Sequence, residues 1–366
     1  MLVKRLAVIA LSMMLLIVPI TLGSCSEMFP ESPDIAPHLI AEPEQNPVRP
    51  IDSREIEALS AFTSPLTDAQ YRARIDELYR IVAEDGKKPQ FATADPVKPV
   101  YDAAIELLDR YILNSWHTPS GEVNIVHAIH DYLVVSVEYD NELYESYRHG
   151  KDVTDNPAFH IDGVLLNNLA VCDGLSKAFA FLCAVEGVEA TRVTGSYISV
   201  PHAWNKVKVS GVWYNVDVTA DSAYYTVDGN DSRRQLSHGY FLLSDYTMKS
   251  FRPKLHVFES TVMCNLDYDY FGKSEFTIGN KTFSSVVTSQ SELNAIFGAI
   301  SSSNRAVGKI ELKLDFPGKI NINDSDMYVS EINAAYTRLP DADFTTASQR
   351  PYFQAPGGVY LFLIYK

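Results

Sequence analysis

Cys172 stands where a loop-like stretch, residues 167–171, gives way to a helical pattern in "CDGLSKAFAFL". The reactive form of cysteine is the thiolate. The first turn of a helix favours this anion, because unpaired backbone N–H groups and the positive end of the helix dipole lie there. Helical spacing puts Cys172 on the side of Leu175 and Phe179, so we expect it to face inward. The position suits a nucleophile, although a cysteine at a helix start is more often a packing residue.

A nucleophilic cysteine needs a base and a group that orients the base. Two strand-like segments, "HAWNKVKVS" and "GVWYNVDVT", flank Ser210-Gly211, which is a typical two-residue hairpin turn. With that turn the register places Trp204 opposite Asp217 and His202 opposite Thr219. His202 and Asp217 then become diagonal neighbours on one face of the hairpin.

This placement is what a Cys–His–Asp site requires. Asp217 would accept a hydrogen bond from one imidazole nitrogen of His202 and leave the other nitrogen for the thiol. Taken singly, a histidine in a strand and an aspartate in a hairpin are more often structural or exposed. The joint pattern predicts Cys172 as nucleophile, His202 as base and Asp217 as the orienting carboxylate.

Other chemistry-bearing residues give weaker patterns. Cys183 lies between apolar residues inside the same helix and is interpreted as a packing residue, and Cys264 gives no further indication. His127 and His130 are three residues apart on an expected helix, a spacing that permits shared metal ligation. The sequence offers them no third ligand, so we interpret them as part of a solvated helix face. Residues 228–235 resemble half a calcium loop but lack its final Glu and are interpreted as a turn. We predict no metal site and no cofactor.

The segments that carry the three residues resemble the bacterial transglutaminase-like superfamily. The resemblance rests on "AVCDGLSKAFAFLCAVEGV", "HAWN" and "WYNVDVT", with "AIHDYLVVSVEYD" upstream and "YFLLSD" downstream, and spans roughly residues 98–250. It implies an α+β, papain-like core in which a cysteine-bearing helix packs on an antiparallel sheet. It also implies the roles already given to Cys172, His202 and Asp217.

The sequence departs from that family before the cysteine, where Leu169-Ala170-Val171 replaces a common glycine, and after Asp217, where it reads "TADS". The first departure affects the approach to the thiol and the second the rim of the substrate site. Three further residues are predicted to lie near the site, namely Trp204, Asp173 and His160. The backbone N–H of Cys172 is a candidate oxyanion donor.

Helical and strand patterns supply the elements that position these residues. Apolar residues at helical spacing predict helices within 64–86, 97–113 and 121–140, the last with Val126, Ile129, Leu133 and Val137 inward. Strands are expected at 189–198, 202–210 and 211–219, and another strand enters a short helix within 235–248. We place the core with its N-terminal helices at residues 53–260.

Residues 261–366 read as a smaller C-terminal α/β unit of unknown role. Strands are expected at 274–283, 308–316 and 358–366, and helices at 289–300 and 325–339. Because 366 residues exceed one ordinary core, two folded parts are expected.

The N-terminus resembles an export signal. Residues 1–25 contain Lys4 and Arg5, an apolar run of 15 residues, and "LGSC", which resembles the bacterial lipobox with Cys25 as the lipidated residue. Residues 26–52, with six prolines, are expected to form an extended tether. Three cysteines remain after Cys25, so at least one thiol of the exported chain is expected to be unpaired with another of its own.

Composition narrows the function. The net charge is −15 and no basic stripe is present, which disfavours nucleic-acid binding. Together, the export signal, the Cys–His–Asp pattern and the family resemblance imply a lipid-anchored thiol enzyme outside the bacterial cell membrane that acts on a protein or peptide, with cell-wall peptide as one candidate. Peptidase, deamidase and acyl transferase remain open. The alternative is a catalytically silent binding or scaffold module that keeps the fold.

Overall fold

The computed structural model describes residues 56–58, 66–112, 121–227, 231–250, 256–302, 310–315, 352–355 and 358–363. The expected export signal at 1–25, the expected tether at 26–52 and the expected helix at 325–339 lie outside these residues. Among the described residues, no helix is long and apolar enough to cross a membrane.

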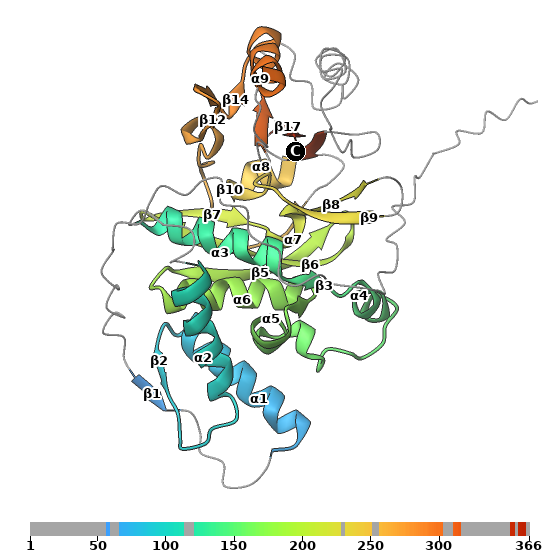
Figure 1. Cartoon of the computed structure of the whole chain (residues 1–366). Coiled ribbons are helices and arrows are strands. Elements are labelled where there is room, and N and C mark those ends of the chain that lie inside the picture. Colours follow the sequence, from blue (N-terminus) through green and yellow to red (C-terminus); the bar gives the residue numbers. More distant parts are fainter. Residues whose placement is uncertain are drawn as a thin grey trace, which may run out of the picture. The chain divides into compact units, whose positions relative to one another are not determined.

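Helices make up the first part of the described chain (Figure 1). Helix α1 (Asp68–Tyr79) begins at a capping box in which Thr67 and Gln70 satisfy each other's backbone N–H groups, and it continues into a π-helical turn, Arg80–Glu84. Helix α2 (Lys98–Leu107) continues in the same way into Leu108–Ile112. Helix α3 (Glu122–Ser136) buries the predicted stripe almost completely, which confirms that prediction. Helices α4 (Asn141–Arg148) and α5 (Ile161–Asn167), with a 3-10 turn at Pro157–Phe159, lead to the cysteine-bearing helix α6 (Cys172–Val185).

A five-stranded antiparallel sheet follows α6. Its strand order is β10–β7–β6–β5–β11. The bounds are β5 Ala190–Tyr197, β6 Val200–Val209, β7 Val212–Val216, β10 Phe241–Leu243 and β11 His256–Val257. Helix α6 packs along β5 and β6, and one hydrophobic core joins it to α1, α2, α3 and the sheet. The cysteine helix is therefore held against the strands that carry the other two candidate residues.

The β6–β7 hairpin has the predicted register but ends earlier than predicted. Val209 pairs with Val212 and Asn205 with Val216, as the turn at Ser210-Gly211 requires. The expected pairing of His202 with Thr219 was wrong, because the strand stops at Val216 and α7 (Val218–Asp221) begins. Asp217 is the N-cap of that one-turn helix, and its Oδ1 accepts a hydrogen bond from the backbone N–H of Ala220 at 2.9 Å.

The remaining elements are short strands and two helices. Parallel pairs join β1 (Ile56–Ala58) to β2 (Lys88–Gln90) and β3 (Glu138–Tyr139) to β4 (Leu169–Ala170). The hairpin β8 (Ser222–Val227) to β9 (Asp231–Leu236) includes residues that were interpreted only as a turn. Helix α8 (Asp245–Ser250) follows β10, as predicted.

The C-terminal part is a mixture of strands and a helix. The strand expected at 274–283 is instead a hairpin of β12 (Glu275–Ile278) and β13 (Lys281–Ser284), because Gly279, at a φ of 63°, supports a tight turn. Helix α9 (Gln290–Ser302) matches its predicted position. A four-stranded sheet has the order β14–β15–β17–β16, with bounds Val286–Val287, Ile310–Leu314, Gly358–Leu363 and Tyr352–Ala355. A 3-10 turn at Phe271–Lys273 precedes it.

Candidate active site

Cys172 is the first residue of α6, and only 6% of it is exposed. The preceding residue, Val171, provides no side-chain cap, so no side chain of the cap competes for the first-turn N–H groups of α6. The thiol lies beside His202 and beside the Tyr139 hydroxyl, and it contributes to the raised pKa of both groups. The predicted nucleophile thus lies at a helix N-terminus with a histidine beside it.

His202 and Asp217 meet as a direct hydrogen-bonded pair. The Nε2–H of His202, on β6, donates to Oδ2 of Asp217 across 2.7 Å. Asp217 is fully buried and His202 is 9% exposed. Because Asp217 engages Nε2, the other ring nitrogen, Nδ1, is left for the thiol.

The charges of this pair follow from its burial and its partners. Burial by itself lowers the pKa of His202, but the Asp217 carboxylate, their hydrogen bond and the Cys172 thiol outweigh burial and raise the pKa to about 10. Burial likewise opposes ionisation of Asp217, yet His202 and His256 hold its pKa well below the usual range. At neutral pH the pair is an imidazolium and a carboxylate.

A second histidine, which sequence reasoning missed, shares the same carboxylate oxygen. His256, on β11, donates from Nε2 to Oδ2 of Asp217 at 2.8 Å, and its Nδ1 is buried without a hydrogen-bond partner. Burial lowers the pKa of His256 more than Asp217 raises it, so the ring stays neutral. The missed signal was the alternation in "HVFE", in which His256 and Phe258 are buried while Val257 and Glu259 are exposed.

The three predicted near-site residues have different surroundings. Trp204 stacks on His202 with 5.8 Å between ring centroids and donates from Nε1 to Oδ1 of Asn215. It therefore supports the base directly. Asp173 instead forms ion pairs with Arg192 and Lys177.

His160 is held by both of its ring nitrogens. Nδ1 lies 2.9 Å from Oδ1 of Asp76, and Nε2 lies 2.9 Å from the carbonyl oxygen of Thr154. These contacts join α1 to the segment before α5, so the observed role of His160 is to connect two elements.

Two tyrosines border the thiol. Burial, together with the nearby Cys172, raises the pKa of Tyr139 far above its usual value and that of Tyr144 to about 12. The rings of the two tyrosines meet edge to face, and the Tyr144 hydroxyl donates to the carbonyl oxygen of Pro201 at 2.9 Å. Both stay neutral hydroxyls at neutral pH and can serve as hydrogen-bond donors at the site.

The other two cysteines of the described chain are also free and buried, in different settings. Burial raises the pKa of Cys183 far above its usual value, and burial also raises the pKa of Cys264 to about 12. Neither is favoured as a thiolate at neutral pH. Cys172 differs from both because His202 lies beside it.

Two groups of side chains within the described residues bring nitrogen and oxygen atoms close enough to hold a metal ion. One is His202, Asp217 and His256, two of which belong to the candidate triad. The other is His127, Asp131 and His238. The expectation that His127 and His130 lie on a solvated helix face was wrong, because His130 is fully buried and His127 is partly buried.

A family model described as the transglutaminase-like superfamily matches residues 110–218. The match is less than half of the chain, and it includes Cys172, His202 and Asp217. It agrees with a cysteine-bearing helix packed on an antiparallel sheet, so the predicted α+β, transglutaminase-like fold class is confirmed. Among curated proteins, the search found no significant match.

Two solved structures are similar in part. One is the crystal structure of a TGase, with 20% identity and a TM-score of 0.32 over 41% of this chain and 38% of that one. The other is a protein from Cytophaga hutchinsonii provisionally described as a cysteine protease, with 20% identity and a TM-score of 0.25 over 33% and 37%. The chain spans well under half the length of either.

Proposed function

We propose that this chain is a thiol enzyme that uses Cys172, His202 and Asp217 to transfer or hydrolyse acyl groups of peptide or glutamine amides. We further propose that it acts outside the bacterial cell membrane, held there by a lipid on Cys25. The export-like residues 1–25 and the Pro-rich residues 26–52 support that location. The family match over 110–218 supports the thiol chemistry at the level of fold.

One observation carries the proposal. His202 lies beside the Cys172 thiol, which contributes to its raised pKa, and its Nε2 is hydrogen-bonded to the Asp217 carboxylate. A base held between a nucleophile and a buried carboxylate has its tautomer and ring orientation fixed before substrate arrives. A histidine that served only to fill space would not need both partners.

The chemistry follows from that arrangement. The Cys172 thiolate attacks the amide carbon, and the oxygen of the amide takes up negative charge near the Cys172 backbone N–H. The C–N bond then breaks, and His202 gives its proton to the departing amine or ammonia, which leaves a thioester on sulfur. Water, deprotonated by His202, releases a carboxylic acid. A primary amine in place of water gives a new amide.

The alternative is a binding module without catalysis. The observation that favours it is the closed surroundings of the thiol, because Cys172 is 6% exposed and lies beside the buried Tyr139 hydroxyl. A polypeptide substrate could reach the thiol only if the Tyr139 side chain moved aside.

A thiol-directed reagent separates the two candidates. The full chain, purified in detergent, is treated with iodoacetamide at pH 7, and labelled peptides are quantified by mass spectrometry. We expect Cys172 to react at least about tenfold faster than Cys183 and Cys264, because an adjacent imidazolium favours the thiolate. His202→Gln should abolish that advantage.

Reaction outcome is then measured directly. The wild-type chain is incubated with a glutamine-containing protein, with and without a fluorescent primary amine, and ammonia and amine incorporation are followed. Cys172→Ala should be inactive and Cys183→Ala should match the wild type. If all three thiols are labelled equally and no thioester is trapped by amine or water, the proposed enzyme activity is contradicted and the binding module is favoured.

A further inference from the structure

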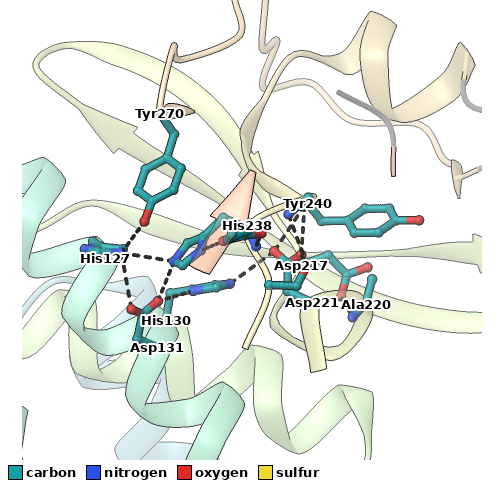
Figure 2. A network of polar contacts seen from close by, with 12 residues as sticks. His127, His130, Asp131, Asp217, Ala220, Asp221, His238, Tyr240 and Tyr270 are labelled. Carbon is teal, nitrogen blue, oxygen red and sulfur yellow. Dashed lines mark hydrogen bonds and ion pairs between the residues drawn. The ribbon is translucent and has the colours of Figure 1, made fainter. Parts of the chain in front are cut away.

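A second buried polar cluster lies around His127, Asp131 and His238, and through His130 its contacts reach Asp221 of α7 (Figure 2). His127 and Asp131 are one turn apart on α3, so they project from the same face of that helix. His238 comes from the segment between β9 and β10, more than 100 residues further along the chain. Figure 2 shows the three side chains directed toward one another.

The three side chains place their ligand-type atoms at nearly equal separations. The Nε2 atoms of His127 and His238 are 3.0 Å apart. Asp131 contributes Oδ2 at 3.2 Å from Nε2 of His127 and Oδ1 at 2.8 Å from Nε2 of His238. Two imidazole nitrogens and a carboxylate therefore form a small triangle.

That triangle has the dimensions of a first coordination shell. An ion about 2.0–2.1 Å from each ligand atom holds neighbouring ligands about 3.0 Å apart at right angles and about 3.4 Å apart at tetrahedral angles. The observed separations of 2.8–3.2 Å lie around the lower limit of this range, as expected where hydrogen bonds hold the same groups together without an ion. Two histidines and one carboxylate are also a donor set that binds zinc and ferrous ions with positions left open.

The surrounding residues hold two of the ligands in the required orientation. Glu311, on β15, accepts two hydrogen bonds from His238, one from the ring Nδ1 at 2.7 Å and one from the backbone N–H of His238 at 2.9 Å. A carboxylate on Nδ1 fixes the orientation of the ring so that Nε2 faces the centre of the triangle. His130 bridges Asp131 at 2.8 Å and Asp221 at 3.1 Å, so both of its nitrogens are engaged and it acts as a support instead of a ligand.

A cavity reaches the cluster from one side. It has a volume of about 200 Å³, and its lining includes His238, Tyr270, Phe241, Asp267, Asp269 and Lys313. The hydroxyl of Tyr270 lies 3.1 Å from Nε2 of His127, and its ring stacks on His238 with 4.3 Å between centroids. A roomy, partly acidic cavity offers a route for a cation and space for water on an open coordination position.

We propose that His127, Asp131 and His238 form a binding site for one divalent transition-metal ion of the zinc type, separate from the Cys172 site. An ion there would connect α3 to the segment that leads into β10. A metal site here differs from the sequence-based expectation of no metal, because only the fold brings the third ligand, His238, close to His127 and Asp131.

Metal binding is tested on the full chain, purified in detergent and stripped with a chelator. We expect isothermal titration with Zn²⁺ to give one site per chain, with Mg²⁺ and Ca²⁺ failing to compete, since these ions prefer oxygen ligands. His127→Ala and His238→Ala should each weaken Zn²⁺ binding at least about a hundredfold, and Glu311→Gln roughly tenfold, the range typical of a second-shell partner.

Matched variants identify the site. His149→Ala removes an exposed histidine of α4 and should leave Zn²⁺ affinity unchanged, as should Cys172→Ala. A wild-type chain that binds no Zn²⁺, or one whose affinity is unaffected by His127→Ala and His238→Ala, overturns the proposal.

Cobalt spectroscopy needs no variant and therefore stands even where a substitution prevents folding. Co²⁺ bound at His127, Asp131 and His238 should give ligand-field absorption without a thiolate charge-transfer band. A thiolate band places the ion at a cysteine and overturns the proposal. The thermal midpoint of the wild-type chain should also rise with Zn²⁺ concentration, because an ion that binds only the folded state stabilises it. A midpoint that stays fixed counts against the site.

Discussion

Asp217 is the residue on which the candidate active site depends. Its Oδ1 caps α7, and its Oδ2 accepts hydrogen bonds from both His202 and His256. Both histidines are buried and Ala220 is partly buried, so the fully buried carboxylate is held from three directions. Such a group cannot turn away from His202 without losing a hydrogen bond elsewhere, which is why the orientation of the base is fixed.

His256 is expected to act as a positioning residue for Asp217. We predict that His256→Phe keeps the fold, because the ring packs among Trp204, Tyr197 and Tyr240 and its Nδ1 already lacks a partner. The rate of Cys172 alkylation should fall roughly tenfold, which corresponds to the loss of one hydrogen bond to a charged group.

The measurement is the pH profile of Cys172 alkylation, with circular dichroism to confirm folding. A purely structural residue would leave that profile unchanged when the protein is folded. His149→Phe, at an exposed position, is the control and should not move the profile. An unchanged profile in folded His256→Phe refutes the positioning role.

At the scale of elements, the first turn of α6 depends on a close approach to the 3-10 turn at Pro157–Phe159. A Cβ on Gly174 would lie 2.2 Å from the carbonyl oxygen of Ala158. That oxygen also accepts a hydrogen bond from the backbone N–H of Val171 at 2.9 Å. Only glycine lets the cysteine helix start at this distance from the turn.

We predict that Gly174→Ala lowers the free energy of unfolding by about 1–3 kcal/mol, the typical cost of overpacking, and slows Cys172 alkylation. Gly298→Ala is the matched control, because nothing lies within 4 Å of its Cβ position in α9. It should raise stability by about 0.5–1 kcal/mol through helix propensity. Urea unfolding measures both, and equal effects would argue against the contact with Ala158.

The sheet is tied to α8 by a buried lysine. Lys206, on β6, is fully buried and forms an ion pair with Asp245 at 2.9 Å, while Asn215 donates to the same carboxylate. Its ammonium group also faces the ring of Phe258. Removal of one member of a buried pair leaves the other charge without compensation.

Lys206→Ala is therefore expected to destabilise the fold by about 3–5 kcal/mol. Lys208→Ala, two residues along the same strand, removes an exposed pair with Glu189 and should cost at most about 1 kcal/mol. Chemical denaturation of the two variants provides the comparison. Similar losses in both would show that Lys206 is not paired as described.

At the scale of the whole molecule, some buried histidines have a raised pKa and others a lowered pKa. The free energy of unfolding should therefore be greatest near pH 6.5. Burial lowers the pKa of His256, so this histidine makes the fold less stable as pH falls below 6.5. At His202 the Asp217 carboxylate outweighs burial and raises the pKa to about 10. The contribution of His202 is complete below pH 6.5 and is lost as pH rises through about 10.

We predict that the free energy of unfolding falls by at least about 2 kcal/mol between pH 7 and pH 10, since one pKa unit corresponds to about 1.4 kcal/mol. Urea unfolding at a series of pH values measures it. His202→Gln should have a shallower slope over the alkaline range. A slope in this variant equal to that of the wild type would contradict the raised pKa of His202.

The sequence by itself determined the local features of this protein. Helical periodicity placed the cysteine helix and the stripe of α3, and Ser210-Gly211 set the register that brings His202 near Asp217. Periodicity and turn chemistry act over a few residues, so they can be read from the chain directly.

The tertiary structure decided the groups that are assembled from distant segments. The hairpin strand stops at Val216 because Asp217 begins a new helix, and His256 reaches the same carboxylate from 39 residues away. His238 meets Asp131 across 107 residues. No short-range pattern encodes such meetings, because they depend on how helices pack on the sheet and on which buried charges must find partners.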